Sequence, residues 1–398
     1  MSEWKKCPIG EVVTLRQGFA INAKSKHYMS KEETSLPLLR IADMKNGTKE
    51  VFVKEEIPQR FIAHPEDIIY TRTGNVGLVF RNNYGVMHNN CFSVTPNDAD
   101  ELSRDFLYYA LQNKTFFDTA NALARGAAQP DLPHTSFNSI EFTYPSLFVQ
   151  ERIAYILSRY DILIENYQKQ IKLLEEAAQR LYKEWFVDLH FPGHENTNIV
   201  DGVPEGWEKK PALDFFEMSI GKTPPRAQKQ WFTKGNNGIP WVSISDMKDT
   251  MFVQETAEEL TLDACENYNI KVVPKGTILL SFKLTVGRVA FAGTDVCTNE
   301  AIAHFQKESD EWKAYTLMYL RNYNYDSLGN TSGISKAVNS TIIKNMPFVM
   351  PCTTILQEFS QRVLPFIKQT ENLQSQLRLL TEARDRLLPK LMGGEITV

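Results

Sequence analysis

The stretch that decides the fold runs from Ile153 to Trp185 and reads IAYILSRYDILIENYQKQIKLLEEAAQRLYKEW. Its apolar side chains recur at alternating spacings of four and three residues, which is the heptad pattern of a helix that packs along one seam. Phe359–Leu391, which reads FSQRVLPFIKQTENLQSQLRLLTEARDRLLPKL, repeats the pattern 206 positions later (359 − 153). A helix of roughly 38 residues around each stretch, at about 1.5 Å per residue, would be a rod of about 55 Å.

Two such helices in one chain most simply pack on each other as a coiled coil. The alternative is that each helix lies on its own domain as an ordinary amphipathic helix. Pro365 lies inside the second stretch, where we expect it to kink the helix or to start it afresh. The residues expected at the coiled-coil seam are Ile153, Leu157, Ile164, Ile171, Leu174, Leu181, Phe359, Val363, Leu373, Leu377, Leu380 and Leu387.

The rest of the chain is also duplicated. Trp4, Pro8 and Gly18 recur as Trp207, Pro211 and Gly221, each 203 positions later (207 − 4), and Asp43-Met-Lys45 recurs as Asp246-Met-Lys248. Identities at one constant spacing indicate a tandem repeat of two equivalent modules. Further on the offset grows to 210 (287 − 77), because the second copy has gained residues between elements, where loop length varies most freely.

Each module mixes short strands with helices, so we predict an α/β (α+β) fold with a pseudo-two-fold internal repeat. Strands are expected at 36–43, 67–72 and 76–80 and again at 239–246, 277–282 and 286–291, and helices at 102–123 and 311–323. The predicted boundaries are a first module at 1–149, a helical spacer at 150–190, a linker at 191–204, a second module at 205–352 and a C-terminal spacer helix at 353–398.

Composition limits the class of protein. The 398 residues carry a formal net charge of −4, so any contact with nucleic acid must come from local basic loops rather than from bulk charge. The five cysteines are scattered and form no CxxC pair, which favours a reducing cytoplasm. No apolar run approaches the length that a bilayer requires, so we expect no membrane partner.

No constellation in the sequence indicates a catalytic or metal site. Ser219–Thr223 resembles the end of a phosphate-binding loop, but Pro224 and Pro225 follow where a helix would have to begin. His190 and His194 have the spacing of metal ligands, but Pro192-Gly193 between them breaks any helix that would align them. We therefore predict no catalytic residue, no metal and no cofactor bound by this chain.

Several loops combine the residues that contact a DNA duplex. Arg and Lys bind phosphates and guanine, Asn and Gln bind adenine, and glycine allows the backbone to approach closely. Corresponding loops carry basic residues in both copies, whereas the residues themselves differ, as two modules that read different sequences would require. The predicted DNA-binding residues are Lys24, Lys26, Arg72, Asn75, Arg81, Arg125 and Gln129 in the first module, and Lys222, Arg226, Lys229, Lys283, Arg288 and Lys336 in the second.

Taken in order, these features resemble the specificity subunit of type I restriction–modification systems over essentially the whole chain. The features that carry the resemblance are the module openings, the repeated Ile-x-Asp-Met-Lys segments, the Gln-Glu helix entrances at 150 and 357, and the helix ends at 173–186 and 379–396. The Gln-Glu pair recurs at an offset of 207 and the heptads at 206, so one helix entrance is shifted by a residue.

The resemblance implies a non-catalytic, cytoplasmic subunit with two target-recognition domains, each of which reads half of an asymmetric, bipartite DNA site. The two helices would form an antiparallel coiled coil that sets the gap, so that four residues inserted within Tyr167–Leu174 would lengthen it. Two methyltransferase subunits, bringing S-adenosylmethionine, would dock on the chain, with the exposed helix faces near 169–184 as candidate surfaces. Restriction (translocase) subunits would add ATP and Mg chemistry. The alternative is a non-enzymatic protein–protein adaptor with a coiled-coil spacer.

Overall fold

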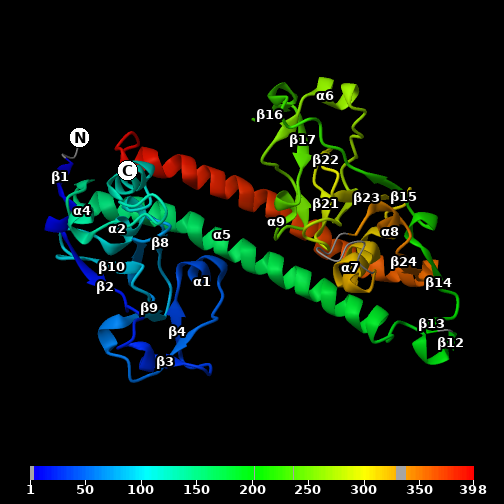
Figure 1. Cartoon of the computed structure of the whole chain (residues 1–398), viewed down its shortest axis with the longest axis horizontal. Coiled ribbons are helices and arrows are strands. Elements are labelled where there is room, and N and C mark those ends of the chain that lie inside the picture. The colour runs from blue at the N-terminus through cyan, green and yellow to red at the C-terminus, as the bar shows by residue number, and fades with distance from the viewer. Residues whose placement is uncertain (1–3, 201, 236, 329–337) are drawn as a thin grey trace. The chain divides into compact units, whose positions relative to one another are not determined.

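The computed structural model describes residues 4–200, 202–235, 237–328 and 338–398. They form two compact units, the first from Met1–Ile164 and Leu380–Val398 and the second from Glu165–Leu379. Each unit therefore combines one module with the start of one long helix and the end of the other (Figure 1). This arrangement makes the two helices antiparallel and confirms the predicted α/β repeat.

The long helices are α5, Leu147–Tyr182 with 36 residues, and α9, Thr353–Met392 with 40 residues. Helix α5 begins three residues before the predicted spacer, because Gln150 is buried and fixes the entrance. Its side chain accepts a hydrogen bond from the Ser103 backbone N–H and donates to the Glu101 carbonyl, at 2.8 and 2.9 Å. After Tyr182 the chain makes one π-helical turn, Lys183–Val187, so the helix ends before the predicted residue 190.

Pro365 does not start a new helix, because α9 is continuous through it. Proline removes one backbone hydrogen bond from the helix. Val363 and Ile367 on either side of it are both buried in the core of unit 2, and this packing holds the turn in place. Of the two outcomes expected at Pro365, a kink or a fresh start of the helix, the fresh start is therefore wrong.

The first module is built on an antiparallel sheet in the order β2-β10-β7-β8. Its strands are β2 (Val13–Gln17), β7 (Ile68–Thr71), β8 (Val79–Phe80) and β10 (Cys91–Pro96). Helices α2 (Arg104–Ala110), α3 (Lys114–Leu123) and α4 (His134–Asn138) complete its hydrophobic core. Ile153 and Leu157 of α5 and Leu391 of α9 are buried in the same core, so both long helices are anchored to this module.

A smaller sheet and a two-stranded ribbon complete the first module. The small sheet, in the order β3-β5-β4-β9-β6, has its own core around Phe19, Leu38 and Val86. Its strands are β3 (Met29–Ser30), β4 (Leu36–Leu39), β5 (Phe52–Val53), β6 (Ile62–Ala63) and β9 (Gly85–Met87). The ribbon pairs β1 (Lys5–Pro8) with β11 (Glu141–Tyr144).

The second module repeats this plan. Its main sheet, in the order β15-β23-β20-β21-β18, consists of β15 (Glu217–Ile220), β18 (Phe252–Val253), β20 (Ile278–Ser281), β21 (Val289–Ala292) and β23 (Ile302–Gln306). The small sheet contains β16 (Phe232–Thr233), β17 (Ile239–Val242), β19 (Glu259–Leu260) and β22 (Cys297–Thr298). Helices α6 (Leu262–Asn267), α7 (Lys313–Asn322) and α8 (Ser340–Lys344), and a ribbon of β14 (Glu208–Pro211) with β24 (Pro347–Met350), complete it.

Three predicted elements are divided or shortened in the structure. The strand expected at 36–43 ends at Leu39, and α1 (Ile41–Asn46) follows, because Asp43 turns back to accept hydrogen bonds from Arg40 and Thr48 at 2.5 and 2.7 Å. The helix expected at 102–123 is two helices, since Asn113 caps α3 with its side-chain oxygen. In the second module the strand expected at 239–246 likewise ends at Val242, before the 3₁₀ turn Ser245–Met247.

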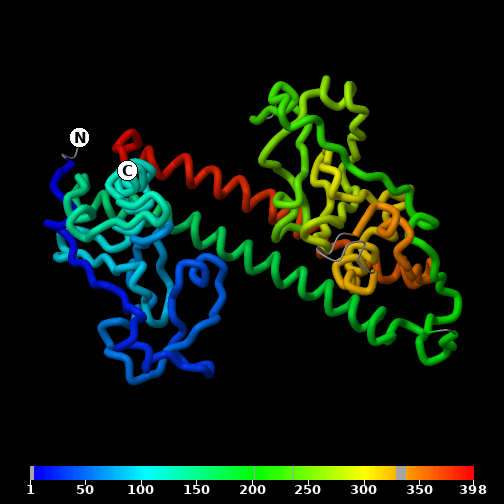
Figure 2. The backbone as a smooth tube through the Cα atoms, in the orientation of Figure 1, coloured from blue at the N-terminus to red at the C-terminus, as the bar shows by residue number. Residues whose placement is uncertain are grey.

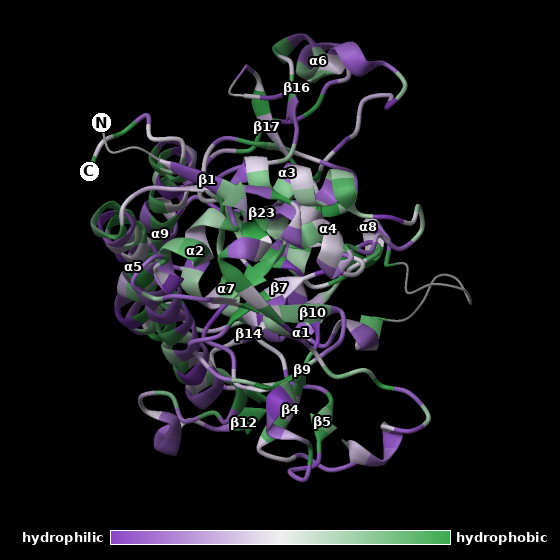
Figure 3. Ribbon diagram, turned by 90° about the vertical axis from the view of Figure 1, so that its left-hand side faces the viewer, coloured by the Kyte–Doolittle hydropathy of each residue, from purple (hydrophilic) through white to green (hydrophobic). Residues whose placement is uncertain are grey.

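The linker expected at 191–204 contains a short hairpin, β12 (Ile199–Val200) with β13 (Val203–Pro204), whose course between α5 and β14 is traced in Figure 2. Hydropathy is mixed along the long helices, whereas hydrophobic colour concentrates on the core strands of each module (Figure 3). Within the described residues, no helix is both long and apolar enough to cross a membrane.

Candidate nucleic-acid interface

In the first module, two loops that are distant in sequence are joined through Asp131. The loop after β7 and the loop 125–131 exchange backbone hydrogen bonds, including one of 2.8 Å from the Gly74 N–H to the Pro130 carbonyl. The carboxylate of Asp131 accepts hydrogen bonds from Arg72 at 2.7 Å and from Thr73 at 2.5 Å. Burial raises the pKa of Asp131, but these hydrogen bonds outweigh it and hold that pKa below its usual value. The carboxylate therefore stays charged and fixes both loops.

This bracing divides the predicted residues into two kinds. Arg72 is half-buried, and it also donates to the Gln17 side-chain oxygen at 3.2 Å, so its guanidinium shapes the loop. Asn75, Arg125 and Gln129 are exposed on the two braced loops. They form the part of this surface that is free to meet a ligand, and we call them the first reading cluster.

Arg81 belongs to a different site. Its guanidinium lies 3.3 Å from Asp161 of α5, donates to the Tyr109 hydroxyl at 3.2 Å and stacks on the Tyr108 ring at 4.1 Å. Asp161 also accepts a hydrogen bond of 2.9 Å from Arg384 of α9. Arg81 therefore attaches the module to the two helices, and we expect no DNA contact from it.

Lys24 and Lys26 are exposed on the turn that precedes β3. This turn is held locally, because Ser25 donates to the Ala20 carbonyl at 2.6 Å and the Asn22 side chain accepts from the Lys24 N–H at 2.9 Å. Tyr28 of this turn packs on the core of the small sheet. The two lysines are thus a second exposed basic point on the first module.

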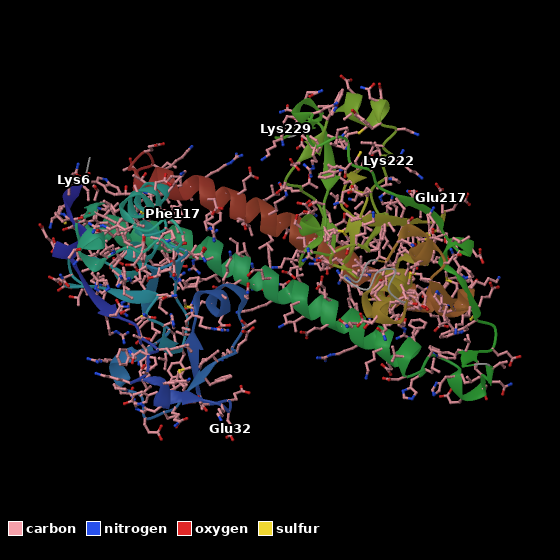
Figure 4. The ribbon with its side chains drawn as sticks, in the orientation of Figure 1. Lys6, Glu32, Phe117, Glu217, Lys222 and Lys229 are labelled. Atoms are coloured by element: carbon pink, nitrogen blue, oxygen red, sulfur yellow. The ribbon has the colours of Figure 1, made fainter. Side chains whose placement is uncertain are left out.

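In the second module, the loop 221–229 follows the end of β15. Lys222 and Lys229 are exposed there (Figure 4), and Lys222 Nζ donates to the Asn269 carbonyl at 3.0 Å. Arg226 is more restrained, since it pairs with Glu258 at 2.6 Å and lies over the Trp241 ring at 4.4 Å. The loop therefore presents lysines, while its arginine packs on the small sheet.

Glu300 lies close to this loop and to Lys283 of the loop between β20 and β21. It accepts a hydrogen bond from the Thr223 hydroxyl and experiences the charges of Lys283 and Arg226. Burial raises the pKa of Glu300, but the hydrogen bonds and the two cations together bring it below its usual value. A charged carboxylate thus lies between two basic loops, as Asp131 lies between the two loops of the first module. We call Lys222, Lys229 and Lys283 the second reading cluster.

The remaining predicted residues of the second module contribute less. Arg288 donates a hydrogen bond of 2.7 Å to the Ile244 carbonyl, which ties the β20–β21 loop to the turn after β17. The loop 331–336, with Lys336, lies outside the described residues.

The stretch that resembles a phosphate-binding loop is held by a buried histidine of the same sheet. Ser219, in the stretch that resembles a phosphate-binding loop, lies in β15 and bonds to the ring of buried His304 at 2.8 Å. His304 also contacts the Thr298 hydroxyl at 2.7 Å, and burial lowers the pKa of this histidine to about 4. His304 is therefore neutral at pH 7.

The predicted seam residues differ in burial along the helices. Ile153, Leu157 and Ile164 are buried at one end of α5, as are Phe359, Val363 and Leu373 in α9. Helix α5 also contacts α9 in unit 2, where the ring centroids of Tyr182 and Phe359 lie 6.4 Å apart. Six seam positions are only partly buried: Ile171, Leu174, Leu181, Leu377, Leu380 and Leu387.

Three acidic residues that organise these surfaces were not predicted from the sequence, namely Asp131, Asp161 and Glu300. A carboxylate in a loop or on a helix surface is common, and its basic partners lie as far as 223 positions away. No local pattern marks such a pair.

The sequence matches the family described as "Type I restriction modification DNA specificity domain" twice, over residues 1–176 and 204–381. The two matches cover most of the chain and coincide with its two copies. The chain therefore belongs to this family, and its function lies in the recognition of DNA sequence.

Its relatives agree with this assignment. The chain is 29% identical to the MjaIX specificity subunit of Methanocaldococcus jannaschii, over 77% of this chain and 72% of that protein. It is 22% identical to the HindI specificity subunit of Haemophilus influenzae over the full length of both. The crystal structure of a type I S subunit from M. genitalium has the same fold, with a TM-score of 0.66, 16% identity and coverage of 98% of this chain and 96% of that one.

Proposed function

We propose that this chain is the specificity subunit of a type I restriction–modification enzyme, and that each module reads one half of an asymmetric, bipartite DNA site. The observation that carries the proposal is that the two modules share one frame and differ at the loops. In each copy a charged carboxylate lies between two loops: Asp131 accepts hydrogen bonds from Arg72 and Thr73, and Glu300 accepts one from Thr223 and lies near the charge of Lys283. The exposed tips, however, are Asn75, Arg125 and Gln129 in one copy and lysines in the other. Two modules with the same framework but different exposed loop residues suit a DNA target whose two halves differ in sequence.

The two long helices would set the gap between the half-sites. Each helix begins in one unit and ends in the other, so we propose that helix length determines the gap. At about 1.5 Å per residue, α9 extends about 60 Å, enough for more than one turn of duplex at about 34 Å each.

The chain would supply specificity without chemistry. Among the described residues there is no group of three or more His, Cys, Asp or Glu side chains that could hold a metal. We propose that S-adenosylmethionine is bound by methyltransferase subunits, and that ATP and Mg are used by restriction subunits that join them. The target adenine would be flipped into the methyltransferase, because the reacting atom is inaccessible within a duplex.

An apolar stripe on α5 suits one of these partner subunits. Phe148, Tyr155 and Ile162 are 64%, 59% and 55% exposed, and the seven-residue spacing places them on one face of the helix. The corresponding positions on α9 are Thr354, Gln361 and Lys368. We propose that a methyltransferase subunit covers this stripe, because burial of three large side chains would contribute several kcal/mol to association.

The test is to co-express the chain with its methyltransferase subunit and to map adenine methylation by single-molecule sequencing. We expect one split motif with two different halves. Methylation at no split motif, from a complex that assembles, would contradict the proposal. The isolated chain, incubated with DNA, S-adenosylmethionine, ATP and Mg, should neither methylate nor cut.

A further inference from the structure

One residue of the second module is unusual for a leucine. Leu284 lies in the loop between β20 and β21, and its side chain is 93% exposed, against 65% for Leu262, the next most exposed large hydrophobic residue among those described. Its backbone is left-handed, with φ of 60°. A left-handed conformation costs a non-glycine residue about 1–2 kcal/mol, and an apolar side chain in water gains nothing from folding.

The first module shows which residue this position favours on conformational grounds. Its equivalent is Gly74, with φ of 83°. The loops are otherwise braced alike: Ser281 donates its hydroxyl hydrogen to the Thr285 carbonyl and accepts from the Arg288 N–H at 3.0 Å. Thr71 makes the same two hydrogen bonds, to the Asn75 carbonyl and from the Leu78 N–H. The frame therefore imposes a left-handed residue at both positions, and the second module places a leucine where glycine would be more stable.

The surroundings of Leu284 indicate what it contacts. Lys283, which belongs to the second reading cluster, precedes it in the chain, so the leucine lies at the edge of this cluster. The positive charges of Lys283 and Arg226 both lower the pKa of the nearby Glu300. Cations of this kind meet phosphates, and a loop tip between them then faces a groove of the duplex. The only apolar group on a base edge in a groove is the 5-methyl of thymine, in the major groove. Insertion of the leucine between bases would instead require unstacking, at a cost of a few kcal/mol.

We propose that Leu284 contacts the 5-methyl group of a thymine in the half-site read by the second module, and so specifies that base pair. The inference rests on the proposed function, since it assumes that this module reads a half-site. The first module, with Gly74 at the same point, makes no such contact, and this difference contributes to the asymmetry of the target.

The experiment uses the complex of the chain with its co-expressed methyltransferase and the methylation motif of the wild-type complex. Duplexes carrying that motif have each thymine of the second half-site replaced, one at a time, by deoxyuridine, which lacks only the methyl group. Dissociation constants are measured by fluorescence anisotropy. We expect one replacement to weaken wild-type binding about fourfold, the value of one buried methyl group, and Leu284→Gly to weaken binding to the thymine duplex to a similar extent.

The matched variants separate a DNA contact from a folding effect. Leu284→Gly should keep or raise the melting temperature, because glycine fits the left-handed backbone, and it should lose sensitivity to the critical deoxyuridine. Leu262→Ala removes another exposed leucine of the second module and should bind as the wild type does. Equal deoxyuridine sensitivity in wild type and Leu284→Gly, or a second half-site without thymine on either strand, would overturn the proposal.

Two other outcomes are also decisive. If 2-aminopurine fluorescence shows unstacking that depends on Leu284 while no deoxyuridine affects binding, the leucine is a wedge and the methyl contact is wrong. If the wild-type complex methylates no split motif, the proposed function fails, which is a result distinct from any of these.

Discussion

Asp161 of α5 and Arg384 of α9 form an ion pair of 2.9 Å, and the same carboxylate lies 3.3 Å from Arg81 of the first module. Arg384 stands in the heptad series where its equivalent on α5 is Ala178. In unit 2 the equivalent of Asp161 is Ile367, which is buried in the core. At this position an ion pair therefore joins the two helices in unit 1, whereas a buried apolar side chain takes its place in unit 2. A polar residue in a seam specifies register at some cost in stability.

Substitution of Asp161 should therefore destabilise the first unit. Asp161→Asn leaves the guanidinium groups of Arg81 and Arg384 facing each other without the carboxylate, so we expect a loss of about 1–3 kcal/mol in the free energy of unfolding. Urea unfolding followed by tryptophan fluorescence measures it. Asp118→Asn is the control, since Asp118 pairs with Lys114 on an exposed helix face and such pairs contribute less than about 1 kcal/mol. Equal losses in the two variants would show that the cluster has no special role.

The first reading cluster should control one half-site only. Gln129→Ala and Asn75→Ala remove exposed amides that can read an adenine edge, whose bidentate hydrogen bonds discriminate by about 1–3 kcal/mol. We expect each variant to methylate motifs relaxed at one position of one half-site, with the other half-site and the gap unchanged. Methylation mapping by single-molecule sequencing measures this. Relaxation in both half-sites, or in neither, would argue against separate readers.

The second reading cluster should determine the salt dependence of binding. Lys222→Gln and Lys229→Gln each remove a cation that we expect to bind a phosphate, so the slope of log K against log salt should fall by about 0.9 for each phosphate that is no longer neutralised. The measurement is anisotropy titration of the complex at several salt concentrations. Lys210→Gln on the β14–β24 ribbon, where Lys210 pairs with Glu208, should leave the slope unchanged.

The helix lengths should set the gap. Duplication of one heptad in both helices, residues 164–170 in α5 and 373–379 in α9, preserves the apolar face and lengthens each helix by about 10.5 Å. At about 3.4 Å per base pair, the methylated motif should gain about three unspecified base pairs, and both halves should keep their sequence. A motif with the original gap, from a complex that assembles, would refute the helices as the measure of spacing.

The second module should lose stability in mild acid. The pKa of His304 is about 4 in the folded chain because of burial, against about 6.5 for an unfolded histidine. Between about pH 4 and pH 6.5, the histidine therefore binds a proton in the unfolded state that it does not bind in the folded state. Stability is therefore constant above about pH 6.5 and falls as the pH decreases towards 4, by at most about 3 kcal/mol. His304→Gln, which can keep hydrogen bonds to Ser219 and Thr298, should remove this slope in urea unfolding at pH 7 and pH 5.

The repeat and the long helices could be predicted because their signals are periodic. Heptad spacing defines α5 and α9 whatever the surrounding structure, and constant offsets mark the copies. The helix does not start afresh at Pro365, because the packing of Val363 and Ile367 offsets the one backbone hydrogen bond that proline removes. The end of β4 at Leu39 depends on the ion pair between Arg40 and Asp43, a competition between helix and strand that alternation of residue types does not show.

The candidate interface was only partly predictable, because residue type gives a charge but not its partner. Arginine is a residue type that commonly contacts DNA. Arg72 and Arg81, however, form hydrogen bonds with Asp131 and Asp161, which are 59 and 80 positions away. Leu284 was missed for the opposite reason. Only the loop geometry shows that it is exposed and left-handed.

Each unit contains the end of the long helix that begins in the other unit. The segment of chain that recombination could exchange between two such proteins is therefore smaller than the folded unit. A crossover at residue 164 would leave 380–398 behind and separate Arg384 from the Asp161 with which it pairs. A crossover before Leu147 would instead keep Asp161 with Arg384, and the incoming module would have to supply the partners that Ser103 and Arg81 provide here for Gln150 and Asp161. Under the proposed function, we expect exchange of a whole module to give a new specificity without a simultaneous change in the helices.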